Sequence, residues 1–266
     1  MTSTTSAERP AFWGVSALLF AASAAGTIVW CASMSGPAEM RMPGGWSMSM
    51  SMAWMRMPGQ TWPGAAASFV AMWDLMMVAM MLPSLLPMLR SYRAAVVSAG
   101  HCRLGRVTVV VGVGYFFVWT LLGAATFPLG VALAALEMRQ PSLARAIPFA
   151  VAAVVLLAGL LQLSAWKARQ LACCREAPAC GRTLSADTGT AWRHGLRLGA
   201  CCSRCCSGLM AVLLSIGVMD LRAMVVVAAA ITVERVAPAG ERVARRTGAV
   251  FIGAGLFLLA QAAGLD

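Results

Sequence analysis

Long apolar runs alternate with short polar segments along this chain of 266 residues. A helix that crosses a bilayer needs about 20 mainly apolar residues. Backbone groups in lipid must be hydrogen-bonded within their own segment, so each such run predicts a helix. The pattern predicts an all-α, polytopic membrane helix bundle of about six spans, in a single domain over residues 1–266. The expected spans are Ala11–Ala32, Ala65–Leu89, Val107–Phe127, Ile147–Trp166, Ser207–Val233 and Thr247–Ala263.

Residues 128–137 follow the third run and admit two interpretations. Pro128 opens the segment, and a proline removes one helical hydrogen bond and bends the chain. The segment is either a short re-entrant piece or a bent continuation of the third span.

Composition agrees with a membrane protein. Hydrophobic residues make up 60% of the chain and charged residues 12%, whereas soluble domains carry about 25% charged residues. The formal net charge is +11. Because most arginines flank the apolar runs, membrane topology and anionic lipid explain this charge better than nucleic acid does. The lipid bilayer is therefore the expected partner.

The basic loops predict an orientation. Loops 90–106 and 167–204 are rich in lysine and arginine, which places both on the cytoplasmic side and with them both termini. The methionine-rich loop 34–64 then lies outside. Loop 234–246 does not fit, because six spans place its four arginines outside as well.

The external loop carries candidate soft ligands. Met48, Met50 and Met52 alternate with serines between Pro and Gly breaks. Thioethers select Cu(I) over hard ions, so a flexible loop could bring several of these sulfurs onto one copper ion. The alternative is an apolar loop lying on the membrane, anchored by Trp46, Trp54 and Trp62.

The second span, with the run "MWDLMMVAMMLP", holds a carboxylate among thioethers. At 100° per residue, Asp74, Met77 and Met81 share one helix face. Ionisable groups inside a membrane suggest function, so this face is a candidate ion path. The alternatives are adaptable packing by the methionines and a structural hydrogen bond from Asp74 to another helix.

Seven of the nine cysteines fall between positions 173 and 206, in the predicted cytoplasmic loop 167–206. Cytoplasmic thiols stay reduced, and reduced thiolates bind Cu(I) or zinc. The open alternatives are Cu(I) handling, a structural zinc site and a thiol–disulfide relay. The candidate ligands are Cys174, Cys202, Cys205 and Cys206.

The fifth span connects this cluster with further candidates. Read as one continuous helix, it places two cysteines, two methionines and an aspartate on one face. Glu234 follows just past its outer end. The aligned positions are Cys202, Cys206, Met210, Asp220 and Met224.

Several segments resemble a family of bacterial inner-membrane proteins described as predicted metal-binding integral membrane proteins, the domain of unknown function 2182. The matching segments are "WDLMMVAMMLPSLLP", "GLLQLSAWKARQLACCREAP", "GACCSRCCSGLMAVLLSIGVMDLRAM" and "ER" at 234–235. The resemblance implies a multi-pass protein of the bacterial inner membrane that handles metal. It carries over Asp74, Met77, Met81, Cys174, Cys202, Cys206, Met210, Asp220 and Glu234.

Three functions are consistent with these features. The first is Cu(I) transport or delivery through the Met/Asp/Cys stripes, since a zinc or nickel handler would show more than two histidines. The second is a subunit or assembly factor of a membrane copper enzyme, with a membrane or soluble protein partner. The third is a membrane thiol–disulfide oxidoreductase. The sequence shows no nucleophile and base typical of a hydrolytic enzyme.

Overall fold

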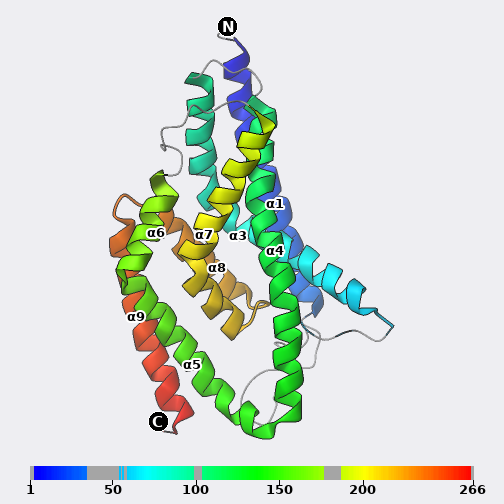
Figure 1. The fold of residues 1–266 in the computed structure, drawn as a ribbon, viewed down its shortest axis with the longest axis vertical. Coiled ribbons are helices and arrows are strands. Elements are labelled where there is room, and N and C mark those ends of the chain that lie inside the picture. The colour runs from blue at the N-terminus through cyan, green and yellow to red at the C-terminus, as the bar shows by residue number, and fades with distance from the viewer. Residues whose placement is uncertain are drawn as a thin grey trace.

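Each apolar run of the sequence becomes helix in the computed structural model of the protein (Figure 1). The structure describes residues 3–34, 54, 56, 59–98, 104–176 and 187–264. Within these ranges it contains eight helices and no strand. They are α1 (Ser3–Met34), α3 (Trp62–Ser98), α4 (Leu104–Arg139), α5 (Pro141–Leu163), α6 (Ala165–Glu176), α7 (Thr188–Ile216), α8 (Leu221–Val236) and α9 (Gly240–Ala262).

Six of these helices contain stretches long and apolar enough to cross a membrane. This confirms the predicted all-α membrane bundle. Four of the segments that contain these stretches are longer than the apolar runs alone indicated, because polar residues continue the helices beyond the apolar part. Ala146–Leu163 ends before the predicted Trp166, and Thr188–Ile216 begins before the predicted Ser207 and ends before the predicted Val233. The apolar stretches lie within Pro10–Ser33, Trp62–Ser98, Leu104–Leu136, Ala146–Leu163, Thr188–Ile216 and Gly240–Ala262.

The ambiguous segment 128–137 is helical. α4 continues through Pro128 to Arg139 without interruption. The re-entrant alternative is therefore wrong, and the second interpretation, continuation of the third span, is confirmed.

The predicted cysteine-rich loop 167–206 is largely helical, which corrects the sequence interpretation. Cys173 and Cys174 lie on α6, and Cys201, Cys202, Cys205 and Cys206 lie on α7. Asp187 caps α7 by accepting hydrogen bonds from two backbone amides of the first turn. The thiols therefore hold fixed positions on two packed helices.

The predicted span Ser207–Val233 is not one helix. α7 ends at Ile216, and Gly217 has φ +133°, a conformation that side chains disfavour. After a short turn α8 begins at Leu221, with Asp220 as its N-cap. The stripe predicted for a continuous helix is therefore broken between Met210 and Asp220.

α8 changes the topology that six spans predict. In Figure 1, α7 descends, α8 turns back through the bundle, and the N- and C-termini lie at opposite ends, not on the same side. The 16 residues of α8 span only about 24 Å. The start of α9 lies beside the start of α6, because Glu241 and Arg245 line one pocket with Ala165 and Lys167.

Glycines bring α4 and α7 into close contact. A Cβ at Gly195 would lie 2.4 Å from the Val111 carbonyl oxygen, and one at Gly199 would lie 2.7 Å from the Tyr115 carbonyl oxygen. Small residues four apart let membrane helices approach this closely. The approach sets Tyr115 against the cysteine face of α7.

Candidate metal centre

Cys202 lies at the centre of a fully buried polar cluster. The Tyr115 hydroxyl donates to its Sγ at 2.9 Å, and Nη1 of Arg235 donates to the same sulfur at 2.9 Å. The three side chains come from α7, α4 and α8, so tertiary packing alone assembles them. Cys202 was predicted as a metal ligand, and the structure places it beside a buried cation.

Arg235 is the hub of this cluster. Its guanidinium also donates to Ser84 Oγ at 2.9 Å and to Met88 Sδ at 3.0 Å. A guanidinium is always protonated in proteins. Among the described residues it contacts no carboxylate, and an unpaired buried charge is costly. Cys202 as a thiolate is therefore the group that can balance Arg235.

Cys206 lies one helical turn after Cys202. Its Sγ is 3.9 Å from Cys202 Sγ, and its thiol donates to the Cys202 carbonyl oxygen at 2.8 Å. Thiols four residues apart share a helix face. The structure thus brings together a buried pair of sulfurs, one next to a cation and one carrying a proton.

Cys174 and Cys205 form a second pair between α6 and α7. Their hydrogen bond, together with burial, raises the pKa of the Cys174 thiol well above its ordinary value. Cys174 is therefore a neutral thiol at ordinary pH. Both side chains are buried, and Cys205 directly precedes Cys206 on α7, so this pair borders the Cys202–Cys206 pair inside the protein.

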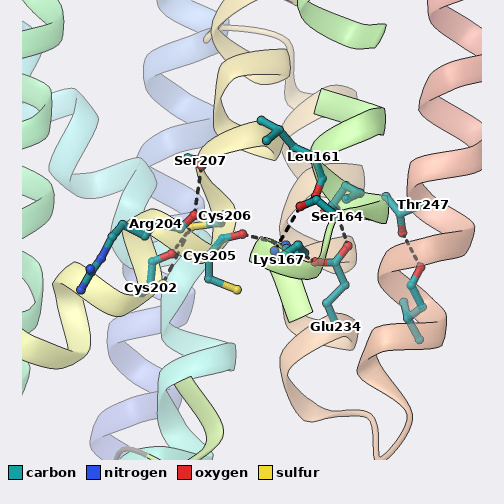
Figure 2. Close-up of polar contacts among 12 residues, drawn as sticks. Leu161, Ser164, Lys167, Cys202, Arg204, Cys205, Cys206, Ser207, Glu234 and Thr247 are labelled. Atoms are coloured by element: carbon teal, nitrogen blue, oxygen red, sulfur yellow. Dashed lines mark hydrogen bonds and ion pairs between the residues drawn. The ribbon is translucent and has the colours of Figure 1, made fainter. Parts of the chain in front are cut away.

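Glu234, predicted as a metal ligand, is engaged in a structural ion pair. Lys167 Nζ lies 2.7 Å from Glu234 Oε2, and Gln162 donates to Oε1 at 2.6 Å. Lys167 also donates to the Cys205 carbonyl oxygen at 2.7 Å. Figure 2 shows Lys167 between the Cys205 backbone and Glu234. The carboxylate therefore joins α8 to α5 and α6, and Lys167 joins α6 to α7.

Asp74 lies apart from the sulfur cluster. Its carboxylate is half-buried and accepts a hydrogen bond from Thr120 of α4 at 3.0 Å. It lines a largely apolar cavity of about 670 Å³ between α1, α3 and α4. The sequence left two interpretations of Asp74 open, an ion path and a structural hydrogen bond to another helix. The contact with Thr120 is a hydrogen bond of the second kind.

The predicted methionine ligands of the helices are core residues. Met77 and Met81 on α3 are completely buried, and Met210 on α7 and Met224 on α8 are buried. All four belong to one hydrophobic core. Asp220 is exposed and caps α8 with bonds to two backbone amides. Met48, Met50 and Met52 lie outside the described residues.

The thiols meet in pairs. Within the ranges that the structure covers, no group of three or more Cys, His, Asp or Glu side chains is placed to hold one metal ion. A tetrahedral zinc site needs four ligands. The buried sulfur pair instead matches the soft, low-coordinate environment that Cu(I) accepts.

Sequence reasoning missed several polar residues in and beside the sulfur cluster. Tyr115, Gln162 and Arg235 each stand as a polar residue within or at the end of an apolar run. An isolated polar group in a membrane segment must find a partner. That signal was available, but only the fold shows that the partner of Tyr115 and Arg235 is Cys202.

The chain is similar to a known protein family. The family model of PpoB2, described as a copper chaperone, matches residues 70–258. The chain belongs to the PpoB2 copper chaperone family. The match contains every member of the buried cluster, whereas α1 and the methionine-rich loop precede it. No curated protein and no solved structure matches the chain. Family membership supports a role in copper handling.

Proposed function

We propose that this protein holds Cu(I) as cargo between Cys202 and Cys206 in the bacterial inner membrane and delivers it to a protein partner. The observation that carries the proposal is the 2.9 Å contact between Arg235 and Cys202 inside the bundle. Copper-family membership and six apolar helices support the same conclusion.

Charge balance explains why the pair suits Cu(I). Without copper, the Cys202 thiolate neutralises Arg235 while Cys206 keeps its proton. When Cu(I) binds both sulfurs, it replaces the Cys206 proton, since a ligating thiol is deprotonated. One positive charge leaves and one enters, so the buried net charge stays the same. A divalent ion would add a charge that costs free energy in this apolar environment.

Delivery agrees better with the fold than conduction along one stripe. The helix carrying Cys202 ends at Ile216, and Asp220 beyond it is exposed and bonded to its own backbone. No continuous ligand row therefore follows this helix through the membrane. The buried thioethers Met88 and Met210 lie in the same core as the pair and are candidate secondary ligands.

The test is elemental analysis of copper bound to protein purified in detergent under reducing conditions. Wild type is expected to carry copper, and Cys202→Ser/Cys206→Ser is expected to lose it because both thiolates are gone. Cys31→Ala is the matched control, since it removes a buried thiol from α1, outside the cluster.

Two results would contradict the proposal. Copper that stays bound in the double variant would place the cargo elsewhere, the methionine-rich loop being the next candidate. Wild type could instead carry one zinc ion per chain and no copper, with the zinc lost in the double variant. The cysteines would then form a structural metal site.

The thiol–disulfide alternative that uses Cys202 and Cys205 is supported less well by the geometry. Cys202 and Cys205 have the C-x-x-C spacing, but Cys202 contacts Cys206 and Cys205 contacts Cys174. A redox C-x-x-C motif requires its own two sulfurs to bond. Copper handling is therefore the better-supported function.

A further inference from the structure

A third thiol pair lies at the surface, outside the candidate ligand set. Cys173 on α6 and Cys201 on α7 have their sulfurs 2.9 Å apart. Cys173 is exposed, and Cys201 is 8% exposed. Neither residue is needed for the buried copper pair, so their contact calls for a separate explanation.

The three pairs form a series from the surface inward. Exposure falls from 8% at Cys201 to 3% at Cys205 and 0% at Cys202. Cys201 and Cys205 lie one turn apart on α7, which places their side chains next to each other, and their partners Cys173 and Cys174 follow each other along α6. Each pair therefore borders the next, ending at the Cys202–Cys206 pair.

The surface around the outer pair is basic. Arg193, Arg197 and Arg204 are exposed and, at 100° per residue, lie within about 80° of helix surface together with Cys201. Nη2 of Arg204 is 4.0 Å from Cys201 Sγ. Arg169, exposed on α6, precedes Cys173 by one turn. Since Cu(I) bound by two thiolates is an anion, these arginines attract a carrier that presents copper in that form.

We propose that Cys173 and Cys201 form a port that exchanges Cu(I) with a soluble, anionic Cu(I)–thiolate carrier. The inference rests on the proposed copper function and adds the place where copper passes between water and protein. Exchange forms bonds from Cu(I) to the sulfurs of Cys173 and Cys201 and breaks the two bonds to the carrier's sulfurs. The two protein thiols release their protons, which the carrier thiolates accept. Copper stays Cu(I), so the step needs no oxidant or reductant.

The experiment compares the rate of copper loading with the final amount loaded. Copper-free wild type and Cys173→Ala/Cys201→Ala in detergent are mixed with Cu(I) in excess glutathione, and protein-bound copper is measured at successive times after rapid desalting. We expect loading of the double variant to slow about tenfold or more, because the pre-positioned dithiol is lost. The copper that finally resists a chelator wash should stay the same, since the inner pair is intact.

Two controls identify the cause of a slower rate. Cys31→Ala removes a thiol from α1 and should load at the wild-type rate. Arg197→Gln/Arg204→Gln keeps all thiols and should slow loading while making it less sensitive to salt, because exposed charges are screened by ions.

A second donor distinguishes the source of the carrier. Cu(I) is supplied on a soluble peptide that has two thiols and acidic flanks. Faster loading from the peptide than from glutathione, lost in the arginine variant, would indicate a protein carrier. Equal rates from both donors would indicate a small thiol.

The outcomes separate the port from the proposed function. If the outer-pair variant loads at the wild-type rate, the port is overturned while the copper function stands. If it loses the chelator-resistant copper, Cys173 and Cys201 belong to the storage site and the port is again overturned. If wild type takes up no copper, the proposed function fails first.

Discussion

Two buried polar regions of this molecule differ in how their charges are satisfied. Around Cys202, four helices supply a guanidinium, a phenol, a hydroxyl and sulfurs that contact one another directly. Around Asp74, one carboxylate meets one threonine hydroxyl at the edge of an apolar cavity. A polar residue in a membrane segment suggests function. The comparison shows that a network of hydrogen bonds around a buried polar residue, more than its charge alone, distinguishes a candidate site.

The largest effect should come from the ion pair that borders the sulfur cluster. Glu234→Gln leaves the Lys167 ammonium buried without its counter-ion, which costs about 3–5 kcal/mol. We expect a clear loss of thermal stability in detergent and loss of bound copper with it. Thermal unfolding of the purified variant measures this.

Two further variants sharpen this prediction. Lys167→Met/Glu234→Gln removes both charges and should recover part of the stability. Glu241→Gln, exposed on α9, should change stability by no more than about 0.5 kcal/mol. Equal losses in Glu234→Gln and Glu241→Gln would show that the buried pair has no special role.

The second effect concerns the glycine contact that seats Tyr115. A Cβ at Gly199 would lie 2.7 Å from the Tyr115 carbonyl oxygen, whereas one at Gly208 would lie 3.6 Å from its nearest neighbour. Gly199→Ala should destabilise the bundle by about 1–3 kcal/mol and weaken copper retention. Gly208→Ala should be neutral or slightly stabilising, because alanine favours a helix. Thermal unfolding and bound copper are measured for both variants. The prediction is contradicted if Gly208→Ala loses more stability and more copper than Gly199→Ala.

A smaller effect is expected at the Tyr115 hydroxyl. Tyr115→Phe removes one hydrogen bond to Cys202 and should cost about 1 kcal/mol of stability. Arg235 still contacts the sulfur, so copper should remain bound but exchange faster. The measurement is the rate at which a Cu(I) chelator removes copper. An unchanged rate would show that the phenol only fills space.

The smallest effect should come from Asp74. Asp74→Asn keeps the shape of the side chain and an oxygen that can accept the Thr120 hydrogen bond. The free energy of unfolding should therefore change by no more than about 0.5 kcal/mol. The amount of bound copper should equal that of wild type within error. Copper binding is measured as for the cysteine variants. If Asp74→Asn abolishes copper loading while Cys202→Ser/Cys206→Ser retains it, the comparison of the two regions reverses.

Local patterns predicted much of the fold. The lengths of the apolar runs identified five of the six long helices, whereas the predicted span Ser207–Val233 joined the end of α7 to α8. Asp187 and Asp220 cap α7 and α8, a role that the sequence analysis did not assign to them. The break at Gly217 was missed because the apolar pattern continues through it. A sharp turn inside an apolar run depends on φ +133° at one glycine, which hydropathy does not record.

The candidate site was predicted in part. Cys174, Cys202, Cys205 and Cys206 were recognised as ligand types, and the structure brings them together on α6 and α7. Helix periodicity could not pair Cys205 with Cys174, because those two residues lie on separate helices. The interpretation of Glu234 as a ligand did not anticipate Lys167, which comes from a segment expected to be a loop.

The sequence by itself determined an all-α bundle with helices that suit a bilayer, and it determined that soft sulfur ligands cluster near residues 173–206. Those properties depend on hydropathy and residue type, which are local. Only the tertiary structure decided that Arg235 contacts Cys202 and that α8 turns back through the bundle. Such contacts join residues far apart in the chain, and helix packing selects them by shape and by the cost of leaving a buried charge unpaired.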